Sequence, residues 1–332
     1  MRMRQRDAGG RPAPDEVDLG PQPEPGEERL EDPGVTDLSR RDHVAILRRA
    51  LKSFNRDHMT NIAAALAYYA FLSIPSAALI AVGVFSLVAG PDAVSTVVDK
   101  LGTVAPDQAT SLLRSSLLRM TEQRGTGLTV LVIGGALALW SLTGAMQNVM
   151  WAANIAYGRE ETRGFVRRRL TALVMVLFWL LAFALAFGVL VLGPHLSTWI
   201  GDAIGARTPV KIAWWVGEWP LLVLGLAAAF AGLMALAPNV KHGRRHLVTI
   251  GAVVTIVVWL VASGAFAFYV SRFGSYNKAW GALAAVVIML TWLWLSSAAL
   301  LLGIETNAEA ERSRELRQGL PAEQELHAPT KA

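Results

Sequence analysis

The sequence predicts an all-α, polytopic membrane protein built as a bundle of six transmembrane helices. Of its 332 residues, 53% are apolar and only 17% are charged, whereas about a quarter of the residues of a soluble domain are charged. The deficit lies in six stretches without Asp, Glu, Lys or Arg: 59–91, 125–158, 170–201, 219–240, 247–271 and 279–304. Each stretch has at least 22 residues, and about 20 apolar residues span a bilayer. A soluble globular enzyme is therefore excluded.

Residues 1–38 predict a disordered tail. Six prolines alternate there with glycine and acidic residues, and few side chains could be buried. The tail begins with Arg2, Arg4 and Arg6, but no apolar run follows closely, so it lacks the pattern of a secretory signal peptide. We therefore expect the first hydrophobic stretch to remain in the protein as an anchor. Behind the membrane domain, which is expected over 58–311, residues 312–332 predict a second disordered tail.

Residues 39–57 predict a basic amphipathic helix in front of the first span. Val44, Leu47, Leu51 and Phe54 recur at spacings of three and four, which places them on one helical face. Six basic residues occupy much of the remaining surface: Arg40, Arg41, Arg48, Arg49, Lys52 and Arg56. Such a helix is expected to lie in the membrane interface, with its cations on anionic headgroups. The alternative, which does not exclude the first, is a helix packed on the cytoplasmic ends of the bundle.

Basic residues predict which connections between the spans are cytoplasmic. The connections 159–169 and 241–246 carry eight Lys and Arg in 17 residues. The connections 92–124, 202–218 and 272–278 carry eight in 57 residues. Because positive residues are retained in the cytoplasm, both termini and the two short basic loops are expected inside.

Two further features mark the predicted outer side of the membrane. Six aromatic residues gather near it, as in the interfacial belts of membrane proteins: Trp199, Trp214, Trp215, Trp219, Tyr276 and Trp280. The connection 92–124 contains two amphipathic pieces separated by Pro106 and Asp107, and a generic linker seldom keeps such apolar periodicity. We expect two short helices there that rest on the outer face, as a lid or a docking surface.

Two spans carry uncharged polar residues at helical spacing. On the first, Asn61, Tyr68 and Pro75 are seven residues apart, and on the second Gln147 and Asn154 repeat this spacing, which is close to two helical turns. Side-chain amides in a membrane need hydrogen-bond partners, so these faces should point into the bundle or into a wet cavity. Asn61, Tyr68, Gln147 and Asn154 are therefore candidates for a polar solute path. The alternative is that they only bond one helix to another.

The sequence offers little catalytic chemistry. Because it has no Cys, thiolate nucleophiles and Cys-type metal sites are excluded. Of the six His, only His242 and His246 lie close together, and no Asp or Glu occurs between Glu218 and Glu305 to complete a metal site. We predict no enzymatic activity, no metal and no cofactor. The basic residues flank hydrophobic segments, so orientation in the membrane explains them better than binding to nucleic acid.

Several positions at the ends or bends of spans are candidates for structural roles. Pro75 should kink the first span, and Pro238 with Asn239 should end the fourth, because proline removes a backbone donor and disfavours helix in the residue before it. Glu305, where the sixth span leaves the membrane, is expected to pair with an Arg of one of the two short basic loops. No carboxylate lies inside a span, which argues against a proton-coupled antiporter.

Four segments, in order, resemble the YihY/BrkB family of bacterial inner-membrane proteins. They are DHMTNIAAALAYYAFLSIP (57–75), WSLTGAMQNVMWAANIAYG (140–158), LAPNVKHGRRHLVTIGAVV (236–254) and FAFYVSRFGSYNKAWGALAAVVIMLTWLWLSSAALLLGIETNAE (266–309). The resemblance covers roughly 40–312 and implies six spans. Asp57, Gly281, Gly303 and Glu305 fall within the matching segments and are candidate structural positions. The family long carried a ribonuclease label, some members were linked to serum resistance, and transport of lipid-like envelope components has been suggested for others.

The six predicted spans, the polar stripes on two of them and the family resemblance together predict a protein that moves or handles lipid-like or envelope solutes at the bacterial cytoplasmic membrane. The alternative is a non-transporting envelope scaffold that binds partners through its tails and loops. Membrane lipids are the expected partners, with anionic headgroups at the helix 39–57, and assembly into a homo-oligomer is left open. Ribonuclease activity is not expected, because the sequence lacks clustered metal ligands.

Overall fold

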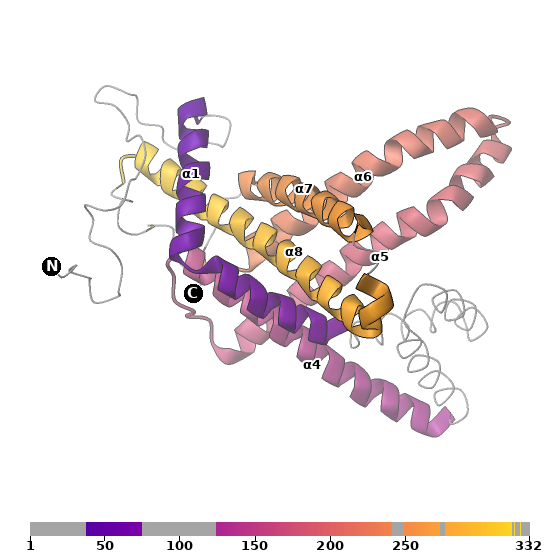
Figure 1. The fold of residues 1–332 in the computed structure, drawn as a ribbon, viewed down its shortest axis with the longest axis horizontal. Coiled ribbons are helices and arrows are strands. Elements are labelled where there is room, and N and C mark those ends of the chain that lie inside the picture. Colours follow the sequence, from indigo (N-terminus) through magenta and orange to yellow (C-terminus); the bar gives the residue numbers. More distant parts are fainter. Residues whose placement is uncertain are drawn as a thin grey trace.

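A computed structural model describes residues 38–74, 124–240, 249–272 and 276–320, together with residues 322 and 326, and helices are the only regular elements in these ranges. In chain order they are α1 (Arg40–Arg56), a helix without a label (Met59–Ile74), α4 (Arg124–Ala156), α5 (Phe165–Ala203), α6 (Arg207–Leu236), α7 (Ile250–Arg272) and α8 (Tyr276–Arg317) (Figure 1). The predicted all-α class is confirmed over this part of the chain.

Four of the described helices are long and apolar enough to cross a membrane: Phe165–Leu190 within α5, Arg207–Leu236, Ile250–Arg272 and Leu283–Arg317 within α8. Each overlaps one of the third to sixth charge-free stretches, and Leu283–Arg317 continues past the sixth into charged residues. The second stretch coincides with α4. The first is helical over Met59–Ile74, and its remainder, with Pro75, lies outside the described residues. A chain with several membrane-spanning helices is therefore confirmed, whereas the count of six stays a prediction.

Two antiparallel helix pairs form much of the membrane part. In the pair α5–α6, the Phe178 ring occupies the space that a side chain at Gly232 would need. In the pair α7–α8, Trp259 and Trp292 meet edge to face with 6.2 Å between ring centroids. Figure 1 shows the tip of the α5–α6 pair standing away from α7 and α8. Each pair is closely packed internally, while the two pairs diverge from each other.

The buried core lies where the pairs meet, close to Met234 of α6 and Gly303 of α8. Buried apolar residues of α4 to α8, of the segments just after α4 and α6, and of the helix Met59–Ile74 share it: Met59, Ile62, Leu66, Met150, Ala153, Tyr157, Met175, Phe230, Leu233, Val240, Ile256, Leu301 and Ile304. Away from this core, large apolar side chains of α5, α6 and α7 are exposed. We call the region formed by α1 and residues 150–163, 229–240, 250–256 and 301–317 the converging end.

Helix α1 lies against the C-terminal half of α8 (Figure 1). It begins with a capping box, in which Ser39 Oγ accepts a hydrogen bond from the Asp42 N–H and the Asp42 carboxylate accepts one from the Ser39 N–H. The face toward the bundle combines small and polar side chains with the fully buried Ile46: Asp42, Ala45, Ile46, Arg49, Ala50 and Ser53. Three residues of the predicted apolar face, Val44, Leu47 and Leu51, are exposed, whereas the fourth, Phe54, is half-buried and packs against the core. Helix α1 thus packs on the bundle through one face and presents an apolar stripe on another.

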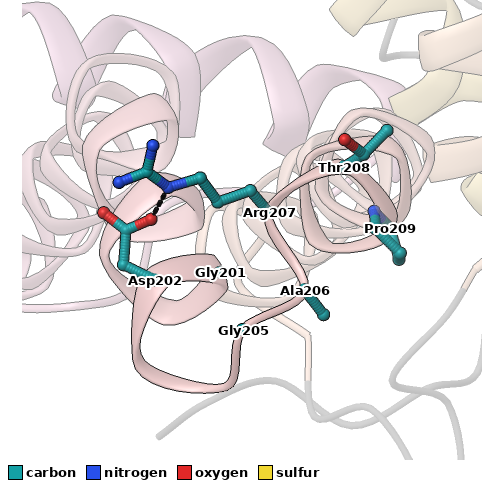
Figure 2. Close-up of a pocket in the computed structure, with 7 residues that line it drawn as sticks. All are labelled: Gly201, Asp202, Gly205, Ala206, Arg207, Thr208 and Pro209. Atoms are coloured by element: carbon teal, nitrogen blue, oxygen red, sulfur yellow. Dashed lines mark hydrogen bonds and ion pairs between the residues drawn. The ribbon is translucent and has the colours of Figure 1, made fainter.

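A tight turn joins α5 to α6 at the far tip of their hairpin (Figure 2). Gly205 has φ +68°, a left-handed conformation that favours glycine. Arg207 Nε donates to the carboxylate of Asp202 across the turn. These residues border an open hollow, lined by Gly201, Asp202, Gly205, Ala206, Arg207, Thr208 and Pro209. Its two charged side chains pair with each other, so the hollow is a poor candidate for binding a charged ligand.

The predicted outer features are described only in part. Trp199, Trp215 and Trp219 are strongly exposed on the α5–α6 hairpin. The two short helices expected in the connection 92–124 lie outside the described residues, except that α4 begins at Arg124.

Candidate functional site at the converging end

Asn154 bonds three segments of the converging end together. Its side chain is 3% exposed near the end of α4. Its Nδ2 donates to Glu161 Oε2 at 3.0 Å, and its Oδ1 accepts the backbone N–H of Asn239 at 2.7 Å. The segment after α6 is thereby attached to the connection between α4 and α5. Asn154 acts here as an interhelical bond, with both ends of its amide in use.

Arg163 holds the same segments together through charge. Its guanidinium donates two hydrogen bonds of 2.7 Å to the Glu161 carboxylate, a bidentate arrangement that gives strong and directional pairing. It also donates to the Ala237 carbonyl at 3.0 Å. This carbonyl belongs to the end of α6, where backbone acceptors lack partners within the helix. Arg163 therefore caps α6 while it orients Glu161.

Asn239 completes this network. Its Nδ2 donates to Thr162 Oγ1 at 2.7 Å and to the Glu160 carbonyl at 3.1 Å. The preceding residue, Pro238, lies just behind the end of α6 at Leu236. The proline ends the helix, and the buried asparagine then fixes the chain that follows.

The network around Glu161 should respond to acid. Burial alone would raise the pKa of Glu161, but hydrogen bonds from Arg163 and Asn154 hold this pKa below the ordinary value of 4.5. Since ionised Glu161 is favoured in the folded state, its contribution to stability is present above pH 4.5 and is lost as the pH falls below it. We expect the melting temperature in detergent to decrease less steeply with acidification in Glu161→Gln than in the wild type. Equal slopes would contradict this role.

Helix α1 is attached to α8 by buried ion pairs. Arg49 Nε donates to Glu309 Oε2 at 2.9 Å, and Ser53 Oγ donates to Glu309 Oε1 at 3.1 Å. About two turns earlier on α1 and two turns later on α8, Arg317 donates to Asp42 at 2.8 Å. The side chains of Arg49 and Glu309 are 7% and 4% exposed. Both charges are thus removed from solvent, and Glu309 lies closer to Arg49 than to Arg312, which is 3.7 Å away.

The crossing of α7 and α8 has almost no space between the backbones. A Cβ at Gly303 would lie 2.5 Å from the Gly251 carbonyl oxygen and 1.8 Å from Thr255 Oγ1. Asn307, one turn along α8, accepts the Gly251 N–H at 2.9 Å and donates to Thr249 Oγ1 at 3.0 Å. Small residues at such crossings allow close packing of membrane helices. The Asn307 amide also bonds the start of α7 to α8.

Glu305 makes no ion pair with the loop 159–169, the one of its two predicted partner loops that the structure describes. Its side chain is 1% exposed, and neither carboxylate oxygen has a hydrogen-bond partner among the described residues. The cations whose charge acts on it are Arg56 and Arg312, from α1 and from α8 itself. The predicted ion pair between Glu305 and the loop 159–169 is therefore not formed, because the turn after α1 lies beside Glu305 instead. The second predicted loop, 241–246, lies outside the described residues.

The four candidate path residues occupy different environments. Asn61 and Tyr68 are exposed on the helix Met59–Ile74. Gln147 of α4 has a buried Nε2 that finds no hydrogen-bond partner among the described residues. Asn154 is buried in the network with Glu161 and Asn239. Of the two candidate amides on α4, Asn154 uses both ends of its amide, whereas the Gln147 donor has no partner among the described residues.

The other predicted positions are placed as follows. Asp57 is the C-cap residue of α1 and pairs with Arg56 at 3.0 Å. Gly281 lies within α8. His242 and His246 lie outside the described residues, and in the ranges that are described no group of three or more His, Asp or Glu could hold a metal ion.

Sequence reasoning missed several residues that hold the converging end together. Arg49 was counted among the headgroup-binding cations, whereas its side chain is buried against Glu309. One signal was available: Glu305, Glu309 and Ser313 recur at spacings of four, which gives α8 a polar face behind its last apolar turn.

Comparison with known proteins decides the family. The family model described as "Virulence factor BrkB" matches residues 50–327. The chain belongs to the BrkB family. The ribonuclease-like protein YfkH of Bacillus subtilis is 31% identical over 232 residues, which cover 69% of this chain and 82% of YfkH. A UPF0761 membrane protein of Vibrio vulnificus is 24% identical over 282 residues, or 80% of this chain and 82% of the relative.

A UPF0761 membrane protein of Azoarcus is 26% identical over 288 residues, which cover 83% of this chain and 66% of the relative. No solved structure gives a significant match. Together with the apolar helices, these relatives identify this BrkB-family chain as a multi-pass bacterial membrane protein. The resemblance noted in the sequence is thereby confirmed.

Proposed function

We propose that this BrkB-family protein moves or handles lipid-like or envelope solutes at the bacterial cytoplasmic membrane, as a transporter rather than an enzyme. The observation that supports this most is the divergence of the pairs α5–α6 and α7–α8 from one packed end (Figure 1). An inorganic ion needs a polar lining along its whole path. A lipid-like solute needs apolar contact for its chains and a few polar groups for its head, which this chain offers.

Gln147 is the polar group that best suits such a solute. Its buried Nε2 has no hydrogen-bond partner among the described residues, and a buried donor without a partner is costly. A headgroup oxygen that accepted this hydrogen bond would remove the cost. Asn61 and Tyr68, exposed on the helix Met59–Ile74, would extend the polar path. Asn154 belongs to the path only if its network opens, because Glu161 and Asn239 use both ends of its amide.

Site-specific photo-crosslinking tests whether a lipid reaches Gln147. We expect a benzophenone-bearing residue at position 147 to capture phospholipid from the surrounding bilayer, detected as a mass increment on the intact protein. The same residue in place of Met150, one turn away and 0% exposed, serves as the matched control and should capture none. If position 147 captures no more lipid than position 150, lipid handling at this site is contradicted.

We further propose that the converging end faces the cytoplasm. It contains Arg159 and Arg163 of the basic loop 159–169, the basic helix α1 and the charged C-terminal turns of α8. Such an excess of positive charge supports a cytoplasmic side. The exposed Trp199, Trp215 and Trp219 would then lie at the opposite membrane surface.

In this orientation α1 would lie in the inner interface, with its apolar stripe Val44, Leu47 and Leu51 toward the acyl chains and its exposed basic side chains on anionic headgroups. An environment-sensitive dye on Leu47→Cys should therefore report an apolar surrounding and be quenched by nitroxide-labelled lipid in nanodiscs. The same dye on Lys52→Cys, exposed on another face of the helix, should report water. Identical spectra at the two positions would contradict an interfacial α1.

A further inference from the structure

Glu305 combines burial with the lack of a direct partner. It is 1% exposed, and both of its carboxylate oxygens are buried without a hydrogen-bond partner among the described residues. An ionised carboxylate in such surroundings is far more costly than a neutral one, because it loses its hydration without gaining a paired charge. Two further carboxylates, Asp57 and Glu309, act on it with the same sign of charge. Burial and repulsion both oppose ionisation at this position.

The cations around Glu305 already pair with other carboxylates. Arg56 donates to both oxygens of Asp57, at 3.0 and 3.1 Å. Arg312 lies 3.7 Å from Glu309, which also accepts from Arg49 at 2.9 Å.

The third element beside Glu305 is the end of α4. There the buried phenol of Tyr157 lies close enough for the Glu305 charge to act on it. The neutral form of Glu305 is favoured by its burial, by the like charges of Asp57 and Glu309, and by the pairing of both nearby cations with other carboxylates.

We propose that Glu305 is a proton-binding site that holds its proton at neutral pH. The proton removes the buried charge and its repulsion from Asp57 and Glu309. When the proton leaves, the carboxylate competes with Asp57 for Arg56, at the turn that joins α1 to the helix Met59–Ile74. Proton binding would thus be linked to the contact between this turn and α8.

A buried protonatable group near the end of a bundle can link solute movement to a proton gradient. The use of the Glu305 proton for transport rests on the proposed function. The binding of a proton by Glu305 does not rest on that function, since it follows from the burial and the contacts of the Glu305 side chain alone.

Infrared spectroscopy of the full chain in lipid nanodiscs measures this proton directly, through the C=O stretch of a protonated carboxyl group. At neutral pH we expect the wild type to show such a band and Glu305→Gln to lose it. The matched control is Glu218→Gln, which alters a partly exposed carboxyl group of α6 and should keep the band. Melting temperatures of the three proteins establish that they are folded.

A wild type without a protonated-carboxyl band at neutral pH overturns the proposal, and so does a band that persists unchanged in Glu305→Gln. Should Glu305→Gln fail to fold, the wild type decides alone, because its band must disappear between neutral and alkaline pH while the protein stays folded. A band that behaves as expected in a protein without transport activity would overturn the proposed function and leave the proton site standing.

Discussion

Gly303→Ala is expected to lower the free energy of unfolding by about 3 kcal/mol or more, at the upper end of what overpacking costs. The added Cβ would lie 1.8 Å from Thr255 Oγ1 and 2.5 Å from the Gly251 carbonyl oxygen. The threonine hydroxyl could rotate away, but the carbonyl belongs to the backbone of α7. The helices would have to separate, which would also strain the hydrogen bond between Asn307 and the Gly251 N–H. Unfolding in mixed micelles, followed by circular dichroism, measures the loss.

Gly264→Ala provides the matched control for this effect. Gly264 lies on α7, and nothing lies within 4 Å of the position its Cβ would take. Alanine there should be neutral or stabilise the helix by up to about 1 kcal/mol. Thr255→Ala combined with Gly303→Ala should recover part of the loss, because the nearer of the two obstacles is gone. Equal stability of Gly303→Ala and Gly264→Ala would show that α7 and α8 do not cross this closely.

Arg49→Ala is expected to cost about 3 to 5 kcal/mol, the usual loss when one partner of a buried ion pair is removed. Glu309 would keep its charge in a buried position, with the Ser53 hydroxyl and the more distant Arg312, at 3.7 Å, as its remaining partners among the contacts described above. Lys52→Ala, on an exposed face of the same helix, should change stability by less than about 0.5 kcal/mol. Chemical unfolding of both variants in the same detergent gives the comparison.

The double variant Arg49→Met with Glu309→Leu distinguishes the contribution of the ion pair to stability from that of the packing between α1 and α8. A buried ion pair replaced by apolar side chains of similar size is often neutral in stability. The double variant should therefore recover most of the loss of Arg49→Ala. A loss equal to the sum of the single effects would mean that the two side chains act independently, against the 2.9 Å contact between them.

The sequence predicts the helices of this protein well because charge-free stretches and helical spacing are local properties. It predicts α1 as amphipathic, and the structure adds which face packs. The apolar stripe of Leu47 and Leu51 points outward, while Arg49 and Ser53 meet Glu309. In a membrane protein apolar side chains have a favourable place in lipid, so an apolar face does not have to be the buried one.

The candidate site was harder to predict because it depends on contacts between distant segments. Gln147 and Asn154 look equivalent in sequence, seven residues apart on one helix. The structure separates them, since Asn154 meets Asn239 from a segment 85 residues away while the Gln147 donor has no partner among the described residues. Glu305 likewise lies near the turn at Asp57 rather than pairing with the described basic loop 159–169. Spacing within one helix carries no information on such partners.

The transfer of a headgroup-labelled phospholipid between leaflets of proteoliposomes tests the proposed function most directly. The wild type should accelerate the transfer over protein-free vesicles, and Gln147→Leu should lose most of this acceleration while remaining as stable as the wild type, because the Gln147 donor has no described partner to lose. Asn154→Leu should instead lose stability by about 1 to 3 kcal/mol, because the buried Asn239 N–H loses its acceptor. A folded wild type that transfers lipid no faster than empty vesicles, or a Gln147→Leu variant as fast as the wild type, would contradict the account and favour a scaffold.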